Sequence, residues 1–71
     1  MEKEAIIRNF ANNLRAERVR KRYTQAHLAE LANISTEYLA RVESGKFSPS
    51  LVVIVNLTTA LKISIDKLIE I

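Results

Sequence analysis

The sequence predicts an all-α protein, a single compact bundle of five helices over residues 1–71. Apolar residues recur at spacings of three and four along almost the whole chain, which is the period of a helix with one buried face. The strong helix formers Ala, Leu, Glu, Lys and Arg are abundant. The single glycine and the single proline, Gly45 and Pro49, lie close together and divide the chain into two helical blocks.

The first two helices follow from apolar spacing and from a capping residue. A helix over about 3–21 carries Ile7, Phe10 and Leu14 on one stripe. Thr24 is suited to open the second helix, because a threonine oxygen can accept from a free N–H of the first turn. The residues of that helix expected to face inward are Leu28, Ala29 and Leu31.

The third helix is bounded by turn-forming residues on both sides. Asn33 and Ile34 form a tight turn, and asparagine tolerates the left-handed conformation that such a turn requires. Ser35 caps the helix and Gly45 ends it. Its inward residues are Leu39 and Val42.

The second block contains two further helices. The fourth begins at Pro49 and Ser50, and its expected inward residues are Leu51, Ile54, Leu57 and Leu61. Ser64 is expected to cap a short fifth helix, with Asp66 in the first turn, where the helix dipole favours an anion.

Composition excludes several classes of protein. The chain has no cysteine and one histidine, His27, so no cysteine or histidine cage can hold a metal. It has no histidine–nucleophile pair or glycine-rich phosphate loop, so we expect no catalytic residues, no cofactor and no small-molecule ligand. No apolar stretch approaches the roughly 20 residues of a membrane span. The first residues, Met-Glu-Lys-Glu, do not resemble a secretion signal, and we expect a cytoplasmic protein.

Positive charge is concentrated in the first block. Eight basic and four acidic residues lie from Arg8 to Lys46, whereas the two ends together hold three basic and four acidic residues. A short run contains Arg15, Arg18, Arg20, Lys21 and Arg22. Such a run is either a solvated helix end, stabilised by the helix dipole, or a phosphate-binding patch.

Residues 24–44 have the pattern of a helix-turn-helix. Two short helices are joined by about three residues, which makes them cross steeply, and the small Ala29 stands where they come closest. In this motif the second helix enters the major groove of DNA.

Several motifs extend this pattern in a fixed order and spacing. They are Leu14, Arg18, Thr24-Gln25, Leu28-Ala29, Asn33-Ile34-Ser35, Leu39, Val42-Glu43, Gly45-Lys46, Pro49-Ser50-Leu51 and the segment 61–68. In these residues the chain resembles the repressor and Cro family of lambdoid phages, also called the xenobiotic-response-element family, over about residues 10–69. Asn33 departs from the glycine usual in the family's turn, but it can adopt the same backbone conformation. The resemblance implies a lambda-repressor-like fold.

The outward side of the third helix supplies the expected base contacts. With the two apolar residues facing the core, the side chains on or beside the opposite face are Thr36, Glu37, Ala40 and Arg41. Arginine can bind two acceptors of one guanine, and glutamate can accept from cytosine. The resemblance implies base contacts at Thr36, Glu37 and Arg41. The alternative is an ordinary surface pair between Glu37 and Arg41, four residues apart.

Phosphate contacts are expected around the motif. The resemblance assigns one to Gln25, at the start of the second helix, where free N–H groups suit an anion. The full set of candidates is Gln25, Arg22, Asn33, Ser35, Tyr38, Ser44 and Lys46. Tyr38 is equally consistent with the rim of the core. The resemblance also implies a structural ion pair between Arg18 and Glu43, which joins the first helix to the third.

The last two helices, over about 50–70, are more apolar than one inward face requires. Such a surface indicates a partner chain, and we expect a homodimer. The candidate interface residues are Val52, Val55, Ile65, Ile69 and Ile71.

The sequence therefore predicts a regulator that binds double-stranded DNA at a palindromic operator. Restriction–modification controllers and phage repressors are the settings that the resemblance implies. RNA polymerase is a further expected partner if Glu30 provides an acidic contact, but a solubilising surface charge is the favoured interpretation of that residue. The alternative function is a protein-interaction module, such as an antitoxin or an adaptor.

Overall fold

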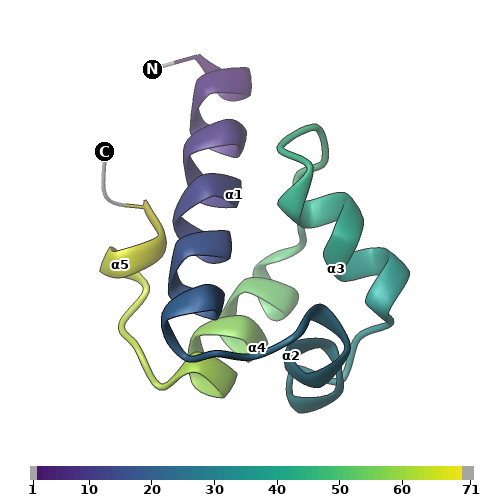
Figure 1. Cartoon of the computed structure of the whole chain (residues 1–71). Coiled ribbons are helices and arrows are strands. Elements are labelled where there is room, and N and C mark those ends of the chain that lie inside the picture. The colour runs from purple at the N-terminus through teal and green to yellow at the C-terminus, as the bar shows by residue number, and fades with distance from the viewer. Residues whose placement is uncertain (1, 70–71) are drawn as a thin grey trace.

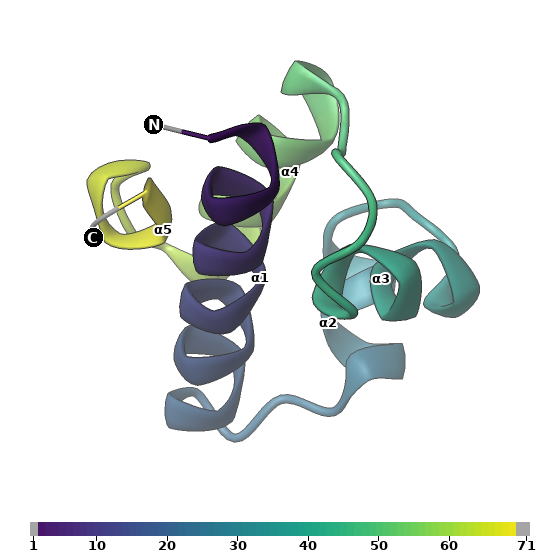
Figure 2. The same cartoon turned by 90° about the horizontal axis from the view of Figure 1, so that it is seen from above.

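The computed structural model describes residues 2–69, which fold into five helices and contain no strand. The helices are α1 (Lys3–Arg20), α2 (Gln25–Leu31), α3 (Thr36–Glu43), α4 (Leu51–Leu61) and α5 (Asp66–Ile69). The helix α1 stands in the middle, with α5 on one side of it and α3 on the other, while α2 packs against α3 and α4 (Figures 1 and 2). The predicted all-helical class is confirmed.

The core is built from apolar residues of all five helices. Its buried members are Phe10, Leu14, Leu28, Ala29, Ala32, Leu39, Val42, Leu57, Leu61 and Leu68. Because α2, α3 and α5 are too short to be stable alone in water, burial against the other helices has to stabilise them. The helix-turn-helix is therefore held in place by the whole domain.

Hydroxyl caps set the starts of three helices. The side-chain oxygens of Thr24, Ser35 and Ser50 accept from the main-chain N–H three residues later, at 3.0, 3.0 and 3.2 Å. Each such cap contributes about 1 kcal/mol. The predicted starts of α2, α3 and α4 are confirmed.

Left-handed residues end or connect the helices. Asn33 has a φ of 60° and Gly45 a φ of 78°, as the turn and the helix end required. Arg22 and Lys62 also have positive φ, at 61° and 58°. Both carry a Cβ atom, which makes this conformation cost about 1 kcal/mol or more.

Three expectations about single residues are wrong. Leu31 is 48% exposed and Leu51 is 70% exposed, although both were expected inside. Each lies roughly a quarter turn or more from the centre of its helix's buried stripe, and Ala32 takes the inward place at the end of α2. Ser64 does not cap α5 through its hydroxyl; its main-chain carbonyl accepts from the N–H of Lys67 at 3.1 Å.

None of the helices in the described part of the chain is both long enough and apolar enough to cross a membrane.

The strain at Lys62 leads to a test of the fold. The variant Lys62→Gly is expected to be about 1 kcal/mol more stable than Lys62→Ala, because glycine adopts positive φ without a Cβ clash. Urea denaturation followed by circular dichroism measures both variants against the parent. Equal free energies of unfolding for the two variants would show that the left-handed conformation of Lys62 carries no strain.

Candidate nucleic-acid interface

The turn between α2 and α3 fixes their relative orientation. The N–H of Ile34 donates to the carbonyl of Ala29 at 2.9 Å, and the N–H of Asn33 donates to that of Glu30 at 3.1 Å. Ala29 is buried, and Ile34 packs against the core. The turn is thus closed by main-chain bonds and anchored by apolar side chains, so α3 is presented in one orientation.

One side of α3 is free for a ligand. Leu39 and Val42 are fully buried on the inner side. The four predicted base-contacting residues are all exposed: Thr36, Glu37, Ala40 and Arg41. Their exposure leaves a charged and polar strip along one side of α3, and the major groove of DNA is wide enough to admit an α-helix.

Arg41 contacts an aromatic ring instead of a carboxylate. Its guanidinium carbon lies 4.4 Å from the centroid of the Phe47 ring. The ion pairs found within residues 2–69 involve neither Arg41 nor Glu37. The alternative of a Glu37–Arg41 surface pair is therefore not what the structure contains, and the hydrogen-bond donors of Arg41 remain available.

The predicted phosphate-contacting residues lie before, between and after the helices of the motif or on them, and they differ in exposure. Gln25 and Tyr38 are half-buried. The exposed ones are Arg22, Asn33, Ser35, Ser44 and Lys46. Two of these are basic, which suits contacts with a negatively charged backbone.

Some of these polar groups already have partners inside the protein. The Ser44 hydroxyl donates to the carbonyl of Arg41 at 2.6 Å and accepts from the N–H of Lys46 at 3.3 Å. The Ser44 hydroxyl proton is therefore already used in a hydrogen bond at the end of α3. The Ser35 oxygen accepts from the N–H of Tyr38, which leaves the Ser35 hydroxyl proton available.

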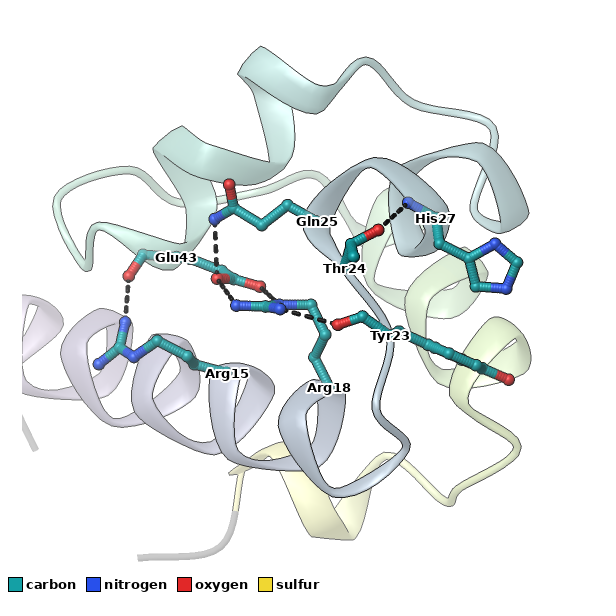
Figure 3. Close-up of polar contacts among 7 residues, drawn as sticks. All are labelled: Arg15, Arg18, Tyr23, Thr24, Gln25, His27 and Glu43. Carbon is teal, nitrogen blue, oxygen red and sulfur yellow. Dashed lines mark hydrogen bonds and ion pairs between the residues drawn. The ribbon is translucent and has the colours of Figure 1, made fainter.

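A buried ion pair connects α1 to α3 (Figure 3). Nε of Arg18 donates to Oε2 of Glu43 at 2.7 Å, and Nη2 donates to Oε1 at 3.2 Å. The side chains are 15% and 3% exposed, respectively. The structural pair that the resemblance implied is present, with the bidentate geometry in which arginine binds a carboxylate most strongly.

Gln25 extends this pair to α2. Its Nε2 donates to Oε1 of Glu43 at 3.0 Å, while Nη1 of Arg18 donates to the carbonyl of Tyr23 at 2.9 Å (Figure 3). The Glu43 carboxylate thus joins α1, α2 and α3. The expected phosphate ligand Gln25 also supports the position of α3.

Sequence reasoning did not single out Phe47, and it treated Arg15 only as part of a basic run. Nη1 of Arg15 donates to the main-chain carbonyl of Glu43 at 2.6 Å, and Nη2 donates to Oδ1 of Asn12 at 2.7 Å. Arg15 lies three residues before Arg18, so helical spacing placed both on one face and was the available signal. For Phe47 the signal was an aromatic residue in an otherwise polar loop directly after α3.

The exposed side chains of this site are suited to recognition. Within residues 2–69, no three acidic or histidine side chains gather to hold a metal ion. Two short helices joined by a tight turn, with an exposed polar strip on the second and basic residues before the first and after the second, define a helix-turn-helix DNA-binding domain.

Comparison with known proteins agrees with this class. The family model described as "Helix-turn-helix" matches residues 14–68. The chain belongs to this helix-turn-helix family of DNA-binding transcription regulators. Comparison with curated proteins gave no match.

Three solved structures are similar to this chain over most of their lengths. The restriction-modification controller protein C.AhdI from Aeromonas hydrophila is 38% identical, with a TM-score of 0.86 over 90% of this chain and 97% of the other. The clp gene regulator ClgR from C. glutamicum is 27% identical, with a TM-score of 0.83 over 89% and 82%. The hypothetical transcription factor NHTF from Neisseria is 26% identical, with a TM-score of 0.85 over 97% and 80%.

The buried pair gives a prediction about stability. The variant Arg18→Met is expected to lower the free energy of unfolding by about 3 kcal/mol, because it leaves the Glu43 carboxylate buried without its cation. The double variant Arg18→Met/Glu43→Met is expected to be more stable than Arg18→Met, since it removes the stranded charge as well.

The control for this test is Arg8→Met. Arg8 is an exposed arginine of the same helix and belongs to neither of the ion pairs found within residues 2–69, so its loss is expected to change stability by about 0.5 kcal/mol or less. The free energy of unfolding of each variant is measured by urea denaturation. If Arg18→Met were as stable as Arg8→Met, the pair would not hold α3 in place.

Proposed function

We propose that this protein is a homodimeric transcription regulator that binds a palindromic operator and controls restriction–modification genes. The observation that carries the proposal is the exposed polar strip of α3, on which Arg41 holds its donors free of any carboxylate. The similarity to a restriction-modification controller over nearly the full length of both chains supports the biological setting.

The side chains of the strip match the pattern of base edges in the major groove. Arg41 would donate two hydrogen bonds to O6 and N7 of one guanine, and Glu37 would accept from the amino group of a cytosine. Thr36 would bond a base or touch a thymine methyl group, while Ala40 would contact only the methyl group. A single protomer would thus read a few base pairs of a half-site.

Basic and polar groups around the strip would bind the backbone of the same half-site. Lys46 follows α3, Arg22 precedes α2, and Gln25 opens α2, where unpaired N–H groups favour an anion. The remaining N–H of the Gln25 amide would reach a phosphate while the other bonds Glu43. These contacts would fix the register without reading sequence.

The apolar surface of α4 and α5 supports a homodimer. The predicted interface residues Val52, Val55, Ile65 and Ile69 are all exposed, and Ile71 lies outside the described residues. An apolar hollow beside this surface is lined by residues of α1, including Ile6, and by Ile54 of α4 and Ile69 of α5. A two-fold axis through such a surface would place two copies of α3 about 34–36 Å apart, one turn of DNA.

Three further parts of the proposal follow from this function. The protein would have no enzymatic activity of its own and would need no cofactor. It would act in the cytoplasm, where a bacterial regulator meets its DNA. Glu30, which is exposed on α2, would be the residue placed to contact RNA polymerase if the protein also activates transcription.

Selection of bound duplexes from a random DNA pool tests operator binding. The expected result is a palindromic sequence with half-sites one helical turn apart. Arg41→Ala is expected to weaken binding to the selected sequence by about 1–3 kcal/mol and to relax preference at one position in each half-site. Binding constants are measured on selected and scrambled duplexes at several salt concentrations.

The charge-matched control for Arg41→Ala is Lys67→Ala. Lys67 is an exposed residue of α5, which lies on the opposite side of α1 from α3 (Figures 1 and 2). The variant Lys67→Ala is expected to leave the preference for the selected DNA sequence unchanged. An equal loss of affinity on selected and scrambled DNA for Arg41→Ala would contradict base reading. A parent protein without any preference, but with stable complexes with another protein, would favour the interaction module instead.

Sedimentation of the free protein at micromolar concentration tests the dimer. The parent is expected to have the mass of two chains, and Val55→Glu the mass of one, because a buried unpaired carboxylate opposes association. Val19→Glu is the matched control, since Val19 is equally an exposed valine but lies on α1, outside the proposed interface. A monomeric parent, with and without operator DNA, would refute the dimer.

A further inference from the structure

Phe47 has a fixed position beside the exposed strip of α3. It is half-buried and packs against the core. Its ring meets that of Tyr38 edge-to-face, with centroids 5.2 Å apart and an angle of 89° between the planes. Aromatic pairs prefer this arrangement, so the ring is held by α3 and by the core together.

The loop that carries Phe47 is itself constrained. Gly45 turns the chain back along α3 with a φ of 78°, a conformation that side chains with a Cβ atom rarely adopt. The hydroxyl of Ser44 then accepts from the N–H of Lys46 at 3.3 Å. The main chain therefore returns Phe47 to the same side of α3 as Arg41.

The contact between Phe47 and Arg41 restrains the arginine without using its donors. The guanidinium carbon lies over the ring, at 4.4 Å from its centroid, and the attraction comes from the electron-rich face of the ring. A carboxylate partner would instead bond the N–H groups that guanine needs. An exposed arginine otherwise samples many rotamers, which it must give up when it binds a base.

We propose that Phe47 is a positioning residue, which holds Arg41 in the orientation needed to read a base and reduces the entropy lost on binding. This inference rests on the proposed function, because it assigns Phe47 a part in the same recognition. Phe47 itself need not touch DNA for this role.

The contact is tested first in the free protein, without DNA. Nuclear magnetic resonance of the parent is expected to show ring-current shifts for the side-chain protons of Arg41. These shifts are expected to disappear in Phe47→Leu, which keeps apolar bulk, and to persist in Phe47→Tyr, which keeps the ring. Well-dispersed amide spectra confirm that each variant is folded. Unshifted Arg41 protons in the parent would overturn the inference and leave the proposed function intact.

The role in recognition is tested on the duplex selected by the parent protein. Phe47→Leu is expected to weaken binding about two- to five-fold, the strength of an exposed cation–π contact, and to relax preference at the base pair read by Arg41. Phe47→Tyr is expected to restore both. In an Arg41→Ala background, Phe47→Leu is expected to have no further effect on binding.

Two outcomes separate this inference from the proposed function. An equal loss from Phe47→Leu in the parent and in the Arg41→Ala background would show that Phe47 acts on its own or only through folding, and would overturn the positioning role. The absence of any preferred sequence for the parent protein would overturn the proposed function directly, before any Phe47 variant is compared.

Discussion

The position of α3 depends on the buried carboxylate of Glu43. This carboxylate is buried at the end of α3 and accepts two hydrogen bonds from Arg18 and one from Gln25. A carboxylate removed from water is tolerable only when such bonds replace its hydration. The carboxylate therefore requires α1, α2 and α3 to meet in one arrangement, and the orientation of α3 follows from that requirement.

Two arginines of similar chemistry have opposite roles around this helix. Arg18 directs its donors inward, to the Glu43 carboxylate and to the carbonyl of Tyr23, so its charge serves the fold. Arg41 rests against the face of Phe47, and its donors form no ion pair within residues 2–69. The difference arises from surroundings alone, because a guanidinium can bind either along its edge or through its face.

Most of the fold was predictable because the signals for it are local. Thr24 and Ser35 cap helices and Asn33 adopts the left-handed turn, as short-range chemistry requires. Leu31 and Leu51 were misplaced because apolar character alone does not tell which side of a helix end meets the core.

The same limit applies to the candidate site. The exposed side of α3 follows from helical period, since Leu39 and Val42 determine which side is buried. The contacts of Arg15 with Glu43 and of Phe47 with Arg41 join separate segments of the chain, and their partners depend on how α1 and the loop after α3 pack. Such contacts leave only weak patterns in the sequence.

In the proposed dimer, the distance between the two copies of α3 would be set by the core of each protomer. Leu57 of α4 and Leu68 of α5 are fully buried in the same cluster as Leu39 of α3. Close-packed interiors have low compressibility and transmit displacements. The surface formed by α4 and α5 would therefore move together with the polar strip of α3 as one rigid body. The half-site spacing would then be a property of the packed core, and a change of operator spacing would require repacking of the core or a different interface.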